Sequence, residues 1–171
     1  RQSHSFATVR QLSRRAELEG GTGPLDYLRG YAELRWQVPV GSGWVLVRAS
    51  GGAATRDLPR HRAFVLGGRG TLLGEPFRAL AGRRVLWTAV EWQIPVPIPE
   101  IPLGSFAGTG PTMTVAPFVA LGWADGRIPS ASGATSRGVE PSVGLGLGWF
   151  HNLLRLDVGY GVRSRRVAGA L

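Results

Sequence analysis

The sequence predicts an all-β protein, an antiparallel meander of about seven strands that forms part of a larger transmembrane β-barrel. Three observations lead to this fold class. Segments of about ten residues alternate between apolar and polar side chains, as membrane-spanning strands do. No apolar run reaches the ~18 residues that a membrane helix needs. Charged residues make up only 18% of the chain although 43% of it is hydrophobic, an unusual balance for a soluble domain.

The strands follow from period-two alternation along the chain. The clearest run places Val90 and Trp92 on one face and Trp87 and Glu91 on the other. The first run is weakly patterned, because adjacent arginines at positions 14 and 15 interrupt its apolar face. The predicted strands are Ala7–Glu19, Tyr27–Val40, Gly43–Ser50, Val85–Pro95, Thr112–Ala124, Val139–Phe150 and Leu154–Arg163.

Three of the connections between these strands are long. Residues 60–84 form a glycine-rich loop that is too long for an ordinary hairpin, so we expect it to have a function. Residues 95–111 are rich in proline and cannot form a central strand. Residues 125–138 form a polar loop.

Alternation alone does not distinguish a barrel in lipid from a soluble β-sandwich. Two details favour the barrel. The polar faces are rich in glycine, which suits a lumen partly filled by an inserted loop. Large aromatic side chains also lie on the apolar faces near strand ends, where barrels carry aromatic girdles. Core packing is the alternative for these residues, which are Trp36, Trp92, Trp123, Trp149 and Tyr160.

The basic residues argue against a nucleic-acid partner. The formal net charge is +9, and all 20 basic residues are arginine. They are spread along the chain instead of forming one patch, so we predict no nucleic-acid binding. Arginines on the lumen side either create an anion-preferring interior or pair with Glu33, Glu91, Asp157 or the loop, and we favour pairing. These arginines are Arg29, Arg35, Arg48, Arg155 and Arg163.

Nothing in the sequence predicts an enzyme, a cofactor or a metal site. The chain has no cysteine, so thiolate chemistry does not arise. Its histidines, His4, His61 and His151, lack the spacing of metal ligands. No lysine is present, which rules out a Walker A phosphate loop.

Three segments carry a family resemblance. The loop contains Gly67-Gly68 followed by Leu72-Leu73-Gly74-Glu75, the next strand ends in Glu91-Trp92-Gln93-Ile94-Pro95, and the one after carries Phe118-Val119-Ala120-Leu121-Gly122. From Tyr27 onward, this order resembles the C-terminal barrel of the bacterial surface antigen superfamily, the BamA/TamA-type assembly factors and two-partner secretion transporters. In that family the loop carries a [V/L]-R-G-[F/Y] motif and folds back into the lumen. The following strands carry Glu-aromatic-x-x-Pro and F-x-D-x-G.

The chain departs from the family at two positions. The motif arginine falls at Leu73 and the motif aspartate at Ala120, and in the family these two residues pair and pin the loop. Losing one member of a buried pair costs ~3–5 kcal/mol, whereas losing both together can be nearly neutral. Two substitutes are open: Leu73 could pack against Ala120 and Phe118, or Arg69 could reach Glu91.

The resemblance implies a set of site residues in the loop and lumen. Leu28-Arg29-Gly30-Tyr31 matches the loop motif letter for letter, but it lies inside a predicted strand and remains the alternative position. The predicted site residues are Gly67, Gly68, Arg69, Leu73, Gly74, Glu91, Phe118, Ala120 and Gly122.

The resemblance also implies a location and a function. We expect residues 1–171 to form one domain, the C-terminal portion of a barrel in the bacterial outer membrane, with loop 60–84 in the lumen and the family's last strand missing. The implied function is insertion or translocation of polypeptides by strand pairing at a barrel seam. Its partners would be outer-membrane lipids, client outer-membrane or secreted polypeptides, and periplasmic accessory proteins. A passive pore or transporter barrel and a soluble β-sandwich binding module are the alternatives.

Overall fold

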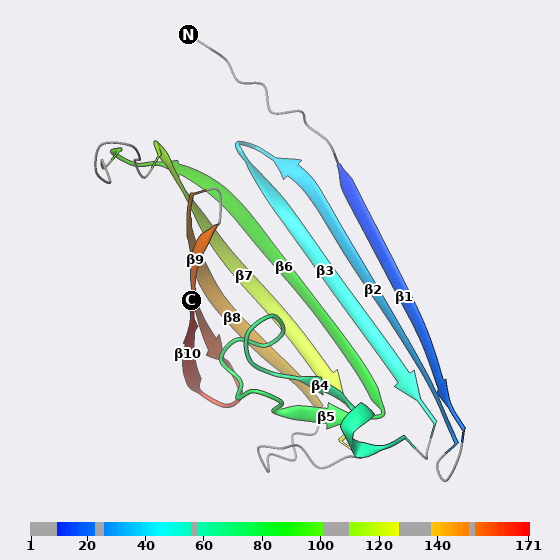
Figure 1. Cartoon of the computed structure of the whole chain (residues 1–171). Helices are drawn as coiled ribbons and strands as arrows, with labels where there is room; N and C mark the ends of the chain where they lie inside the picture. The colour runs from blue at the N-terminus through cyan, green and yellow to red at the C-terminus, as the bar shows by residue number, and fades with distance from the viewer. Residues whose placement is uncertain (1–9, 23–25, 56–57, 101–109, 127–137, 151–152) are drawn as a thin grey trace.

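The computed structural model describes residues 10–22, 26–55, 58–100, 110–126, 138–150 and 153–171. These residues form an eight-stranded antiparallel sheet and a small two-stranded sheet (Figure 1). The large sheet is a meander in the order β1-β2-β3-β6-β7-β8-β9-β10. The small sheet, β4 with β5, belongs to the long loop between β3 and β6. The strands are β1 (Gln11–Gly21), β2 (Tyr27–Val40), β3 (Gly43–Ala54), β4 (Phe64–Leu66), β5 (Leu80–Gly82), β6 (Arg84–Pro97), β7 (Thr112–Ala124), β8 (Gly138–Trp149), β9 (Leu154–Gly161) and β10 (Arg166–Ala170).

The predicted strands all form, and the prediction missed three short ones: β4 and β5 within the long loop, and β10 at the edge of the large sheet. β2 and β7 have the predicted bounds, whereas β3 continues to Ala54. The start of the first predicted strand, residues 7–9, lies outside the described residues. The chain forms a further strand after β9, because β10 pairs with β9 and places Val167 opposite Tyr160. Five residues with a single large apolar side chain are too few for alternation to be visible.

The proline-rich connector also begins later than predicted. β6 continues to Pro97, and Pro95 and Pro97 lie opposite Thr114 and Thr112 of β7. A proline lacks only its own N–H, so a strand end can keep its register while losing single ladder bonds. Residues 101–109 of the connector lie outside the described part of the chain.

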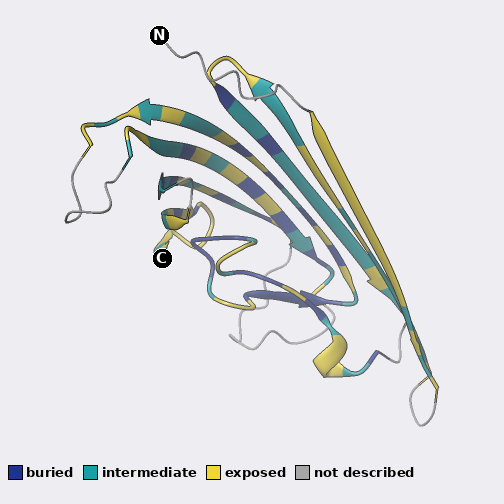
Figure 2. Ribbon diagram, turned by 45° about the horizontal axis from the view of Figure 1, so that its top comes forward, coloured by how far each residue is buried: buried dark blue, intermediate teal, exposed yellow. Residues whose placement is uncertain are grey.

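The two faces of the large sheet have opposite character, as the alternation predicts. On β6, Leu86, Val90 and Trp92 are 59%, 47% and 46% exposed. Trp87 and Glu91 on the other face are 4% and 3% exposed. Figure 2 shows the same banding along the central strands, where exposed and buried residues alternate. The apolar face is thus open, and no second sheet covers it among the described residues, which is typical of a surface that contacts lipid.

The hydrophobic core lies between the loop and the concave face of the sheet. The loop lies across this face in front of β7 and β8 (Figure 1). The core cluster consists of Phe64, Leu66, Leu72 and Leu80 from the loop with Val85, Trp87, Ala89, Ala120 and Ala124 from the sheet.

No helix in the described residues has the length and apolar character needed to cross a membrane.

Candidate functional site

The tip of the long loop is a tight turn that begins at two glycines. Gly67 and Gly68 have φ angles of 120° and 80°, which favour glycine. The Gly67 N–H donates to the Thr71 hydroxyl oxygen at 2.9 Å, and the Gly68 N–H donates to the carbonyls of Leu72 and Glu75, each at 3.1 Å. The predicted glycine pair therefore shapes the segment that meets the sheet.

Leu72 fixes the turn to the sheet by shape. Its side chain is fully buried, with 0% exposure. A Cβ atom at Gly122 of β7 would lie 2.6 Å from Leu72 Cδ1 and 3.1 Å from Leu66 Cδ1. Gly122 therefore leaves the space that Leu72 occupies, which brings one predicted site residue into contact with the loop. The prediction did not include Leu72 among the site residues. The feature that could have identified it is the apolar pair Leu72-Leu73 inside a polar, glycine-rich loop.

Hydrogen bonds anchor the main chain of the turn to two strands. The indole N–H of Trp87 on β6 donates to the Thr71 carbonyl at 2.9 Å. The hydroxyl of the fully buried Ser142 on β8 donates to the Leu73 carbonyl. Backbone carbonyls that would otherwise be buried without a partner are satisfied in this way.

The turn also packs closely on β9 and the segment that follows it. Gly74 has a φ of 108° and lies against the backbone of Tyr160 and Gly161, where a side chain has no room. The Ser164 hydroxyl donates to Glu75 Oε1 at 2.6 Å. The turn thus spans the concave face from β6 to β9, which explains how a loop with little regular structure holds one position.

The structure places the two substituted motif positions at one cavity. Leu73, Phe118 and Ala120 all line it, and Leu73 is only 8% exposed. Leu73 also packs over Gly159 of β9, where an added Cβ would lie 2.8 Å from the Leu73 Cβ. Apolar packing and a main-chain hydrogen bond therefore hold Leu73 in this position.

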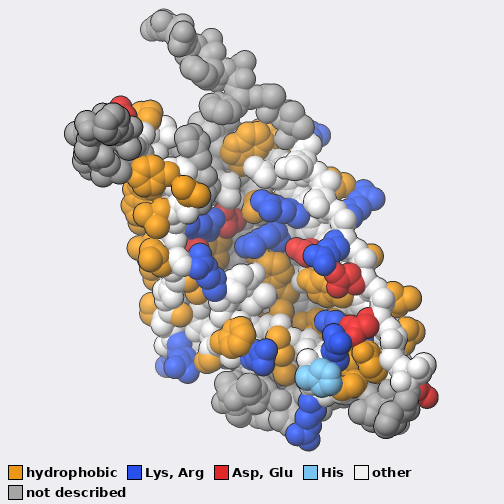
Figure 3. All heavy atoms as spheres, in the orientation of Figure 1, with side chains coloured by type: hydrophobic (Ala, Val, Ile, Leu, Met, Phe, Trp, Pro, Cys, Tyr) orange, Lys and Arg blue, Asp and Glu red, His pale blue; other side chains and the backbone are white. Residues whose placement is uncertain are grey.

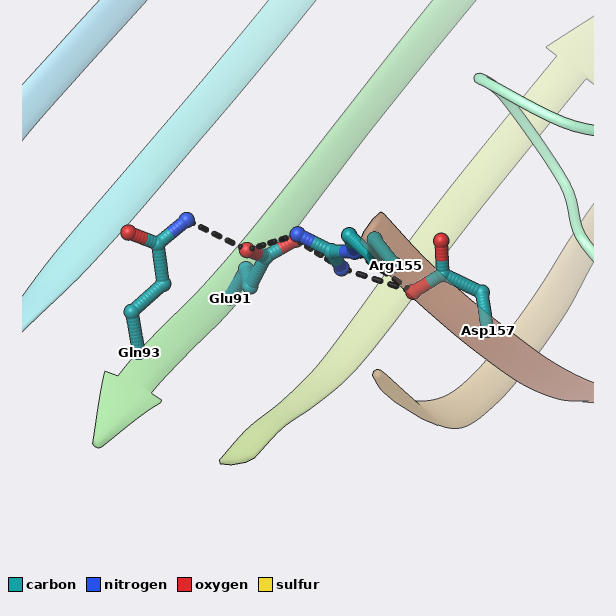
Figure 4. Close-up of polar contacts among 4 residues, drawn as sticks. All are labelled: Glu91, Gln93, Arg155 and Asp157. Carbon is teal, nitrogen blue, oxygen red and sulfur yellow. Dashed lines mark hydrogen bonds and ion pairs between the residues drawn. The ribbon is translucent and has the colours of Figure 1, made fainter. Parts of the chain in front are cut away.

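Glu91 pairs with Arg155, across the concave face from β6 to β9 (Figure 4). The Arg155 guanidinium meets Glu91 Oε1 at 2.9 Å and Oε2 at 3.0 Å. Gln93 donates to Glu91 Oε1 at 2.7 Å, and Asp157 Oδ1 accepts from Arg155 at 2.8 Å. The bidentate geometry is the strong form of this contact.

The expected Arg69–Glu91 pair is therefore wrong. Arg69 instead donates to the main-chain carbonyl of Leu171. Two strands, β7 and β8, lie between Glu91 and Arg155. Arg155 extends over β8 because that strand is lined by glycine: a Cβ at Gly146 would lie 2.6 Å from the Arg155 Nη2. The alternating glycines are visible in the sequence. Only the curved sheet shows that the Arg155 side chain passes over them to Glu91.

The alternative motif position lies inside the sheet. Arg29 and Gly30 belong to β2, where Arg29 pairs with Glu19 at 3.2 Å. Its guanidinium also stacks over the Phe64 ring, 4.3 Å from the ring centroid. This arginine therefore contacts the base of the loop from the sheet and is not itself in the loop.

No metal centre is found in the part of the chain that the structure describes. It contains no group of three or more histidine, cysteine, aspartate or glutamate side chains placed to hold an ion. His4 and His151 lie outside the described residues. The absence of enzymatic activity stays a prediction.

Comparison with known proteins gives a structural match alone, since neither the family models nor the curated proteins match this chain. Among solved structures it is similar to the crystal structure of BamA from Haemophilus ducreyi lacking POTRA domains 1-3. The TM-score is 0.59 at 15% identity, over 87% of this chain. The chain has the fold of a BamA barrel segment.

The match covers 34% of the BamA chain, so this chain spans about a third of its length. It confirms the predicted fold class, an antiparallel part of an outer-membrane β-barrel with a long inserted loop. In a barrel of this kind the concave face lines the lumen and the convex apolar face meets lipid. The loop, Glu91 and Arg155 therefore lie on the lumen side.

Proposed function

We propose that this protein is an outer-membrane barrel of the assembly or translocation type, which helps to insert or translocate polypeptides by pairing strands at a barrel seam. The observation that supports this function is the BamA-like sheet with a long loop docked on its concave face. Its partners would be outer-membrane lipids, client polypeptides and periplasmic accessory proteins. No covalent step and no cofactor are required.

The physical basis is backbone hydrogen bonding at a strand edge. An unpaired backbone N–H or C=O group costs several kcal/mol in lipid. A client strand that adds to such an edge satisfies these groups whatever its sequence, which suits a factor that handles many clients.

The docked loop favours this function over that of an open pore. Leu72, Trp87 and Ser142 hold the turn against the lumen face, where it occupies space that a passive channel would keep open. We therefore expect the complete protein to conduct solutes poorly. A passive pore or transporter barrel remains the second candidate because the lumen face also carries a charged cavity.

Reconstitution tests the two candidates together. The full-length protein is placed in lipid vesicles, and an unfolded outer-membrane barrel is added as client. We expect faster folding of the client, measured by its heat-modifiable migration on gels, and little solute conductance. Conductance without acceleration of folding would favour the pore. Vesicles with an unrelated barrel of similar size provide the control.

A further inference from the structure

We propose that the concave face binds a small oxyanion, a phosphate or a carboxylate, between Arg35 and Arg48 beneath the tip of the loop. This site goes beyond the proposed assembly function and does not depend on it. It lies in a cavity of about 420 Å³, a size that holds a small ligand. Figure 3 shows basic side chains gathered in the hollowed middle of this face.

The strand register places two arginines directly opposite each other. Arg35 of β2 is the cross-strand partner of Arg48 of β3, and both line the cavity. Like charges in this position destabilise a sheet unless a counter-charge lies between them. The next residues along the same row are Ala89 and Ala120, whose small side chains leave space beside the arginines. Loop residues 69–71 complete the lining.

The acidic side chains of the cavity are already engaged. Glu91 and Asp157 both pair with Arg155. In the described residues Arg35, Arg48 and Glu33 form no direct ion pair, although the carboxylates of Glu91 and Glu33 lie near enough to attract Arg48.

Arg48 is the better held of the two arginines. Its guanidinium lies over the Trp87 ring, 5.2 Å from the centroid, while its buried Nε has no hydrogen-bond partner. The guanidinium carries further N–H groups that form a planar fork. This fork matches the oxygens of phosphate and carboxylate. The lining arginines Arg35, Arg48, Arg69 and Arg155 outnumber the two acids, so the cavity attracts anions.

Calorimetry on the full-length protein in detergent tests the site, with pyrophosphate and citrate as probes at constant ionic strength. We expect saturable binding of at least one probe. The double variant R35Q/R48Q should weaken it about tenfold or more, since both forks are lost. The matched control R60Q/R84Q removes two exposed arginines outside the cavity and should bind like the wild type. The tighter probe identifies the ligand as phosphate-like or carboxylate-like.

Three outcomes would overturn the proposal: no saturable binding of either probe to the wild type, undiminished binding by R35Q/R48Q, or an equal loss in R60Q/R84Q. Folding is checked separately by heat-modifiable migration. If the double variant does not fold, the single variant R48Q replaces it in the binding test, and R48Q must then weaken binding. R48K keeps the charge but loses the fork, so intermediate affinity would assign the role to guanidinium geometry and unchanged affinity would count against the site.

Discussion

At the scale of single residues, the buried carboxylate of Glu91 is the most constrained group on the lumen face. It is 3% exposed and receives two bonds from Arg155 and one from Gln93. A buried charge is tolerated only when it is paired and hydrogen-bonded. This chain lacks the motif's own pair at Leu73 and Ala120, yet it keeps an ion pair elsewhere on the same face.

Removing Arg155 should destabilise the folded protein. Arg155→Met leaves Glu91 buried without its cation, and we expect a loss of ~3–5 kcal/mol in the free energy of unfolding. Thermal unfolding, followed by heat-modifiable migration, measures it. Arg15→Met is the matched control, because the Arg15–Glu17 pair is exposed and such pairs contribute ~0–1 kcal/mol. Equal effects of the two substitutions would argue against the pair.

A charge reversal identifies the partner of Glu91. Glu91→Arg should destabilise the protein by placing a second cation beside Arg155. Adding Arg155→Glu should restore part of the stability, because the pair is rebuilt with its signs exchanged. Adding Arg69→Glu should restore none, since Arg69 contacts the Leu171 carbonyl instead. Rescue by Arg69→Glu in unfolding experiments would show that the loop arginine is the partner.

At the scale of elements, the loop is held by complementary shape more than by charge. Leu72 enters the space above Gly122, and the main chain is bonded by Trp87 and Ser142. These anchors come from three strands, β6, β7 and β8, so the loop adopts its position only after the sheet has formed.

A single methyl group should loosen the loop. In Gly122→Ala the added Cβ would meet Leu72 Cδ1 at 2.6 Å, and such overpacking costs ~1–3 kcal/mol. We expect faster tryptic cleavage after Arg69 and Arg78, with the strands intact. Gly30→Ala is the control, because its nearest neighbour is Leu18 Cδ1 at 3.8 Å. Unchanged cleavage in Gly122→Ala would show that the loop is held by other contacts.

At the scale of the whole molecule, the open apolar face decides where the protein can exist. Leucine, valine and tryptophan side chains cover the convex face, and no described element packs on it. An exposed apolar surface of this kind calls for lipid or detergent. A soluble β-sandwich would bury it against a second sheet.

A charge on this face should block insertion. Val90 lies midway along β6 and is 47% exposed. We expect Val90→Arg to cost ~2–4 kcal/mol, the penalty for an arginine facing lipid near the bilayer midplane. The folded fraction in vesicles measures this cost, and Val90→Leu should fold normally. Full folding of Val90→Arg, or a monomer that stays in water without detergent, would refute lipid contact.

The pattern of side chains predicted the strands where it was long and regular. β2 and β7 have the predicted bounds because each alternates over more than ten residues. β10 was missed because its five residues, with one large apolar side chain, carry no readable period. The loop glycines and Gly122 were found through the family resemblance, whereas Leu72 and Ser142 were not identified as loop contacts.

The sequence by itself determined the class of fold and the two faces of the sheet, because alternation is a local property of each strand. Only the tertiary structure decided which side chains meet. Arg155 lies 64 residues from Glu91, and the two are joined by the curvature of the sheet and the glycines between them. The register between β2 and β3 likewise places Arg35 opposite Arg48. Register depends on how two separate strands align, so the pattern of a single strand does not determine it.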